Sequence, residues 1–155
     1  MPSFTLERVI PAPPEDVFDV SLDVGLHLAS QRSHGERVAS GRTSGRLEEG
    51  EQITWSARHF GLRFRMTSLA FDVDRPRRFR DRQVRGPFGS FVHTHEFVPL
   101  DGATLMRDTI DFRSPLGPLG RVVDAVAMRR HLIRVITERN DAISAHFAGA
   151  APSLG

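Results

Sequence analysis

Residues 77–113, RRFRDRQVRGPFGSFVHTHEFVPLDGATLMRDTIDFR, decide the fold of this chain. Apolar and polar residues alternate in three stretches, 77–85, 91–100 and 103–113, and a period of two is typical of half-buried β-strands. GPFGS separates the first two stretches, and Asp-Gly, a dipeptide strongly favoured in two-residue hairpin turns, separates the last two. The segment therefore predicts three consecutive antiparallel strands.

The Asp-Gly turn also predicts a register, because a two-residue loop pairs the residues that flank it. His95 then faces Asp108. For the GPFGS hairpin we expect the register that keeps apolar side chains on one face, since a slip of one residue would turn every side chain over. That register pairs Gln83 with His93, Asp81 with His95, and Phe79 with Phe97.

These registers separate a largely apolar face from a charged one. The charged face carries the arginines of residues 75–85, where six of eleven residues are Arg, and it places Arg80, Glu96 and Arg107 side by side. We interpret the arginine-rich stretch as the outer surface of a sheet. A nucleic-acid partner is not expected, because no aromatic residues interleave on that face and the net charge is only +2.

The rest of the chain predicts more strands and one long helix. Strand patterns occur at 3–10, 51–59 and 62–73, with a short strand within 34–45. Two short helices are expected after the first strand, interrupted at Gly25. Residues 118–147 predict a single amphipathic helix, because apolar residues recur every three or four positions. These are Leu119, Val122, Val126, Ile133, Ile136, Ile143 and Phe147.

An antiparallel sheet with one polar face must bury the other face, and only the long helix is large enough to cover it. We predict an α+β fold in which a seven-stranded curved antiparallel sheet wraps around the C-terminal helix. One domain spans residues 1–148, and residues 149–155 form a flexible tail. The chain has no Cys, no signal-peptide pattern and no apolar run that could cross a bilayer, so we expect a cytoplasmic protein with no integral membrane contact.

The order of elements resembles the START / Bet v1-like (SRPBCC) superfamily of helix-grip proteins over essentially the whole chain. RFRDRQVRGPFGSFVHTHEF, ATLMRDTIDFRSPLG and ITERNDAI are similar to a bacterial subgroup of largely uncharacterised ligand-binding or cyclase/dehydrase-like proteins. Phe91 and Phe112 stand where that subgroup usually has Trp and Tyr. The resemblance implies a cavity between the sheet and the C-terminal helix that binds a small hydrophobic ligand, in a binding, carrier or sensor role without a cofactor.

The candidate ligand-binding residues are the inward-facing aromatic and polar side chains. An apolar cavity with a few polar groups is typical of a small-molecule site. The alternative is structural: the aromatic residues form an ordinary core, and Asp81, His95 and Asp108 form a hydrogen-bonded row that holds the strands in register. The candidates are Trp55, Phe64, Phe79, Asp81, Gln83, His93, His95, Phe97, Asp108 and Phe112.

Two other functions remain open. The first is an enzyme resembling polyketide aromatase/cyclases, in which a His or Asp moves a proton, although no catalytic residue is assigned. The second, less favoured, is a cupin-like metalloenzyme, because His93 and His95 share a face. Cupins also need a nearby Glu, and Glu96 is expected on the opposite face, so no bound metal is predicted. The sequence leaves a homodimer open.

Overall fold

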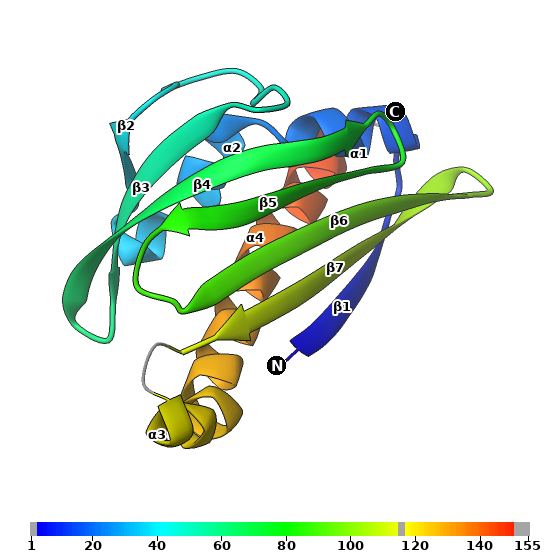
Figure 1. Ribbon diagram of the computed structural model, residues 1–155. Helices are drawn as coiled ribbons and strands as arrows, with labels where there is room; N and C mark the ends of the chain where they lie inside the picture. Colours follow the sequence, from blue (N-terminus) through cyan, green and yellow to red (C-terminus); the bar gives the residue numbers. More distant parts are fainter. Residues whose placement is uncertain (1–2, 115–116, 151–155) are drawn as a thin grey trace.

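A seven-stranded antiparallel sheet curves around one long C-terminal helix, which confirms the predicted fold class (Figure 1). The computed structural model describes residues 3–114 and 117–150. The strand order is β1-β7-β6-β5-β4-β3-β2. The strands are β1 (Ser3–Ile10), β2 (Arg37–Ser40), β3 (Gln52–His59), β4 (Leu62–Asp74), β5 (Arg78–Arg85), β6 (Ser90–Leu100) and β7 (Ala103–Arg113).

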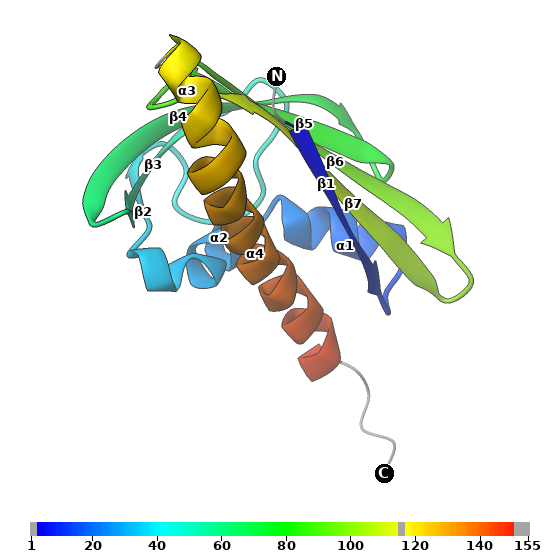
Figure 2. The ribbon, with the colours of Figure 1, turned by 90° about the horizontal axis from the view of Figure 1, so that it is seen from below.

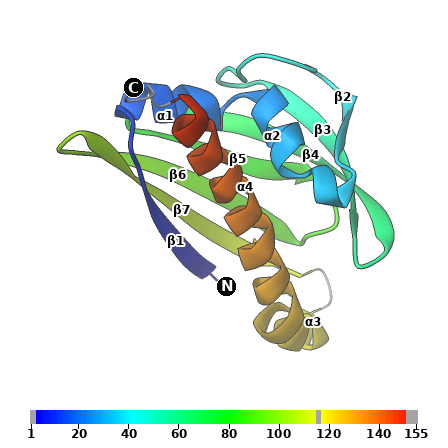
Figure 3. The ribbon, with the colours of Figure 1, turned by 180° about the vertical axis from the view of Figure 1, so that it is seen from behind.

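The helices lie on the concave side of this sheet. Figure 2 shows the C-terminal helix running beneath the curved strands, and Figure 3 shows the two short helices beside it. They are α1 (Pro14–Ser21), α2 (Val24–Ser30), a 3-10 turn η1 (Arg32–His34), α3 (Gly117–Val123), a π-helical segment η2 (Asp124–Met128) and α4 (Arg129–Ala150). Among the described residues, no helix is long and apolar enough to cross a membrane.

The two short helices form as predicted, but the break between them lies before Gly25. Asp23 is the N-cap of α2, and its carboxylate accepts a hydrogen bond from the backbone N–H of Leu26 at 2.8 Å. Such a cap satisfies a backbone donor that the first helical turn leaves unpaired, so it starts a new helix at this point. Gly25 lies inside α2.

The register of the β6–β7 hairpin is the predicted one, with His95 opposite Asp108 and Phe91 opposite Phe112. The predicted register of the β5–β6 hairpin is wrong: Asp81 faces His93, and Phe79 faces His95. The cause is the side chain of Gln83, whose amide accepts from the Phe88 N–H at 3.1 Å and donates to the Phe88 carbonyl at 2.8 Å. These bonds hold a wider loop than the sequence suggested. Because the register differs by an even number of residues, every side chain keeps its predicted face.

The outer face of the sheet carries the arginines, as predicted. Arg78 pairs with Asp72 at 3.0 Å, and Arg107 lies 3.4 Å from Glu96. Arg80 stacks over the ring of Phe71, with its guanidinium carbon 5.0 Å from the ring centroid. Neighbouring acids and an aromatic ring therefore stabilise these guanidinium groups on the outer face. The side chains of Phe79, Phe97 and Met106 point to the opposite face and are buried.

The C-terminal helix is long, as predicted, but its first turns do not cover the sheet. Leu119, Val122 and Val126 were expected on the buried face, and all three are exposed, Leu119 at 67%. The reason is twofold. The segment η2 adds residues to the helical turn, which rotates α3 relative to α4, and α3 lies beyond the ends of the strands (Figure 1). The helix continues to Ala150, and residues 151–155 of the predicted tail lie outside the described residues.

Candidate functional site

A cavity of about 360 Å³ lies between the inner face of the sheet and the helices α2 and α4. Its volume is within the range of small-molecule binding sites. Most of its wall is apolar, with side chains from β3, β4 and α4 lining it. These include Ile53, Trp55, Ala57, Phe64, Met66, Ala70, Leu132, Val135 and Ile136.

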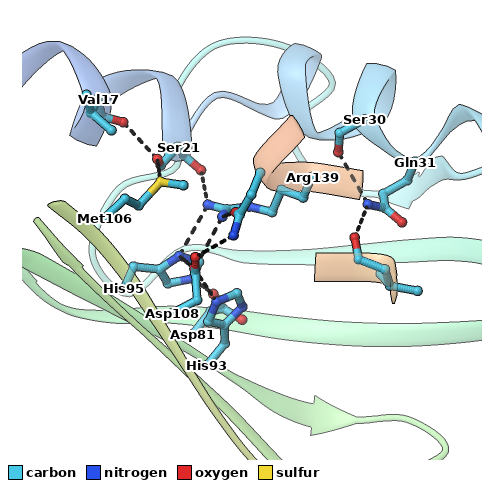
Figure 4. A network of polar contacts seen from close by, with 12 residues as sticks. Val17, Ser21, Ser30, Gln31, Asp81, His93, His95, Met106, Asp108 and Arg139 are labelled. Carbon is cyan, nitrogen blue, oxygen red and sulfur yellow. Dashed lines mark hydrogen bonds and ion pairs between the residues drawn. The ribbon is translucent and has the colours of Figure 1, made fainter. Parts of the chain in front are cut away.

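One end of the cavity wall is polar and is built by three strands and the C-terminal helix. Asp81 comes from β5, His93 and His95 from β6, Asp108 from β7, and Arg139 descends from α4 onto them (Figure 4). Inward side chains on neighbouring strands lie close together because residues alternate faces along each strand. We call these five residues the polar cluster.

Asp108 is the buried anchor of the polar cluster, with no exposed side-chain surface. Its carboxylate accepts from His93 Nε2 at 2.8 Å, from Arg139 Nη1 at 3.3 Å and from Asn140 Nδ2 at 3.0 Å. Burial alone would raise the pKa of this carboxyl, but the hydrogen bond from His93 and the Arg139 charge hold it well below its ordinary value. Asp108 therefore remains ionised.

Asp81 and His95 form the second pair, with His95 Nε2 2.7 Å from Asp81 Oδ2. The other ring nitrogen, Nδ1, lies 3.2 Å from Arg139 Nη2. Because a guanidinium can only donate, Nδ1 accepts there, and the proton of a neutral His95 ring is on Nε2, donated to Asp81. Burial opposes ionisation of Asp81, but the bond from His95 and the neighbouring charges together outweigh it, so the pKa of Asp81 is lowered.

His93 is a buried, neutral imidazole that lines the cavity. Burial, reinforced by the neighbouring His95, lowers its pKa to about 4, although Asp108 acts in the opposite direction. Its ring stacks on that of His95, with centroids 3.6 Å apart. Since an ionised carboxylate only accepts, His93 donates the Nε2 proton to Asp108 and keeps a lone pair on Nδ1.

Six of the ten candidate residues line the cavity, and four do not. Gln83 lies outside the wall and holds the β5–β6 loop. Phe97 and Phe112 belong to the two buried core clusters, where Phe97 packs against Phe18 and Phe112 against Phe4. Asp108 lies behind the histidines. Those that do line it are Trp55, Phe64, Phe79, Asp81, His93 and His95.

The sequence analysis missed Arg139 and Asn140, which are both buried. The signal was present: both fall between Ile136 and Ile143 on the apolar repeat of the C-terminal helix. A charged residue on the buried face of a helix requires a partner in the core. Inward acids on the sheet were already expected, so an acidic partner for Arg139 could have been predicted, but not that this partner is Asp108.

A second group of histidines lies where the cavity approaches the surface. His59 Nδ1 is 2.8 Å from His131 Nε2, and His34 contacts Glu138 at 3.0 Å. Burial lowers the pKa of His59 to about 4, with the neighbouring imidazoles contributing. The adjacent Phe60 lines the cavity and is mostly exposed, so this group marks an opening.

The polar cluster also resembles a set of metal ligands. One ligand atom each of Asp81, His93 and His95 lies within 4.8 Å of the other two. A dication there would meet the Arg139 guanidinium, which contacts His95 at 3.2 Å. It would also compete with the bond from His95 to Asp81. The positive charge of Arg139 and the hydrogen bond that already occupies His95 Nε2 make the cluster a poor metal site.

We therefore expect the untagged protein to contain no stoichiometric zinc, iron or manganese when it is measured by elemental analysis. Adding zinc should also leave the thermal midpoint unchanged, because a specific site would stabilise the folded state. One equivalent of metal that disappears in His95→Ala but persists in the surface variant His146→Ala would contradict this expectation.

The comparisons with known proteins agree with this architecture. The family model described as "Polyketide cyclase / dehydrase and lipid transport" matches residues 1–148. No curated protein matches the chain. The protein TTHA0849 from Thermus thermophilus has 19% identity and a TM-score of 0.78, covering 97% of this chain and 100% of its own.

Two further solved structures are similar. The Zhui aromatase/cyclase from Streptomyces sp. R1128 has 17% identity and a TM-score of 0.78, covering 99% of this chain and 98% of its own. A START superfamily protein from Mycobacterium smegmatis has 14% identity and a TM-score of 0.71, covering 96% and 99%. These similarities confirm the helix-grip fold and the resemblance noted in the sequence.

Proposed function

We propose that this chain, which belongs to the polyketide cyclase / dehydrase and lipid transport family, binds a small, mostly apolar molecule between its sheet and its C-terminal helix. The cavity of about 360 Å³ is the observation that carries the proposal. A domain of this size could fill such a space with side chains, because protein interiors are normally close-packed. An apolar space closed by a cluster of polar groups instead suits a ligand with an apolar body and one polar end.

We expect the neutral apolar dye N-phenyl-1-naphthylamine to bind one-to-one, with enhanced fluorescence. The variant Ala70→Phe should weaken the binding at least tenfold, because Ala70 is buried on the cavity wall and a benzyl group there would occupy ligand space. The matched control is Leu69→Phe, which adds a ring to the outer face of the same strand. Dye titration measures both.

Equal dye affinity in Ala70→Phe and the unaltered chain would overturn this proposal. Native mass spectrometry of the purified protein provides a second readout, since a retained natural ligand adds a discrete mass that Ala70→Phe should lose. Circular dichroism of the variant establishes that it remains folded, so a loss of binding is not a loss of structure.

A second candidate function is a cyclase or dehydratase. The observation that favours it is the hydrogen-bonded chain from Arg139 through His95 to Asp81, which ends at the cavity surface. Such a chain can position a carboxylate as a proton acceptor. The Zhui aromatase/cyclase is similar in fold across nearly the whole chain. The natural ligand distinguishes the two functions: a binding protein returns it chemically unchanged, a dehydratase returns a product lighter by one water, and a cyclase that closes a ring by addition returns an isomer of equal mass.

A further inference from the structure

The polar end of the cavity offers hydrogen-bond acceptors rather than donors. Oδ2 of Asp81 accepts the proton of His95, but Oδ1 has no hydrogen-bond partner among the described residues. The Asp81 side chain is 26% exposed, although the residue lies deep in the protein, and that surface faces the cavity that it lines. Nδ1 of His93 likewise keeps a lone pair and has no partner in the described part of the chain.

The one guanidinium at this end has no Nη hydrogen left for a ligand. Nη1 of Arg139 donates to Asp108 at 3.3 Å and to Asn140 Oδ1 at 3.1 Å. Nη2 donates to the Ser21 carbonyl at 3.4 Å and lies 3.2 Å from His95 Nδ1. A ligand carboxylate therefore finds no free two-pronged donor of the kind that normally recognises it.

The charges around the cavity also oppose an anion. Of the described residues that line it, Asp23, Glu36 and Asp81 carry carboxylates, whereas Arg139 carries the only guanidinium. Asp108, directly behind the wall, is ionised and already neutralises Arg139. Bringing a further negative charge into this water-poor space would cost desolvation and repulsion together.

We propose that the cavity selects neutral molecules that carry a hydroxyl group at one end of an apolar body, and that it rejects carboxylates such as free fatty acids. The hydroxyl donates to Oδ1 of Asp81, and the lone pair on Nδ1 of His93 accepts from a second donor on the same ligand. This selection rests on the proposed binding function and specifies its ligand class. Within a family whose description includes lipid transport, it narrows the ligands of this chain to molecules without a free carboxylate.

The test uses three probes of one shape: 2-naphthol, naphthalene and 2-naphthoate, each displacing N-phenyl-1-naphthylamine at neutral pH. 2-Naphthol is expected to bind at least tenfold more tightly than naphthalene, because a hydrogen bond to a charged acceptor contributes that much or more. 2-Naphthoate is expected to bind at least tenfold more weakly than 2-naphthol.

The variant Asp81→Asn should reverse the preference. Its amide oxygen keeps the bond from His95 Nε2, so the amide N–H groups face the cavity in place of the carboxylate oxygen. The affinity for 2-naphthol should fall and that for 2-naphthoate should rise, each by about tenfold. Asp111→Asn is the matched control: it removes one negative charge from the outer face of β7 and should leave the order of the probes unchanged.

The outcomes separate the two proposals. If the dye binds but 2-naphthoate displaces it as well as 2-naphthol does, the selection for hydroxyl ligands is wrong and the binding function stands. The same conclusion follows if Asp81→Asn binds the dye normally and keeps the original order of the probes. If neither the dye nor any probe binds the unaltered protein, the binding function itself is wrong.

Discussion

Replacing Asp108 by asparagine is expected to lower the free energy of unfolding by about 3–5 kcal/mol, the usual cost of breaking a buried ion pair by removing one partner. Asp108 is completely buried and accepts hydrogen bonds from His93, Arg139 and Asn140. An amide in its place turns one acceptor into a donor that faces donors already there. It also leaves the guanidinium of Arg139 in the core without its counter-charge.

Urea unfolding followed by circular dichroism measures this loss. Asp111→Asn serves as the reference, because it makes the same chemical change on the outer face of the same strand, where surface substitutions typically alter stability by less than about 0.5 kcal/mol. A loss below about 1 kcal/mol in Asp108→Asn would show that the polar cluster contributes little to folding.

Stability is expected to fall by about 3 kcal/mol as the pH is lowered from 6.5 towards 4, owing to His93 alone. Burial lowers the pKa of His93 from 6.5 to about 4 in the folded protein, whereas the unfolded chain keeps the ordinary value. Between these two pH values the unfolded state binds a proton that the folded state does not. The full contribution is therefore present above pH 6.5 and is lost as the pH falls towards 4.

Unfolding free energies measured across this pH range in the unaltered chain and in His93→Gln test the assignment. Glutamine can still donate to Asp108 but does not titrate, so the slope should decrease by the contribution of His93. Burial also lowers the pKa values of half-buried His59 and His131, which act in the same direction and leave a residual slope. An identical slope in both proteins would mean that His93 is not the group responsible.

A ligand should oppose this acid destabilisation, because a molecule that binds only the folded state stabilises it by mass action. The polar cluster thus contributes both to the stability of the fold and to the proposed ligand binding. Its carboxylates and imidazoles hold β5, β6 and β7 to α4 through buried hydrogen bonds. The one carboxylate oxygen of the cluster left without a partner among the described residues is Oδ1 of Asp81, a residue that lines the cavity.

Local sequence determined the parts of this protein that depend on near neighbours. Alternation of apolar and polar residues predicted the strands, because successive side chains in a strand point to opposite faces. The Asp-Gly turn predicted the β6–β7 register, since a two-residue loop leaves one pairing for the strands that it joins. The alternation of side chains also assigned the arginines of β5 to the outer face before any contact was known.

Only the tertiary structure decided the β5–β6 register and the composition of the polar cluster. The register depends on how the Gln83 amide binds the backbone of Phe88, which alternation does not encode. Arg139 reaches Asp108 across a separation of 31 positions in the chain, and their contact requires the helix to be laid across the finished sheet. The exposure of Leu119 has the same origin, because a helical repeat predicts an apolar face but not whether the sheet extends far enough to cover it.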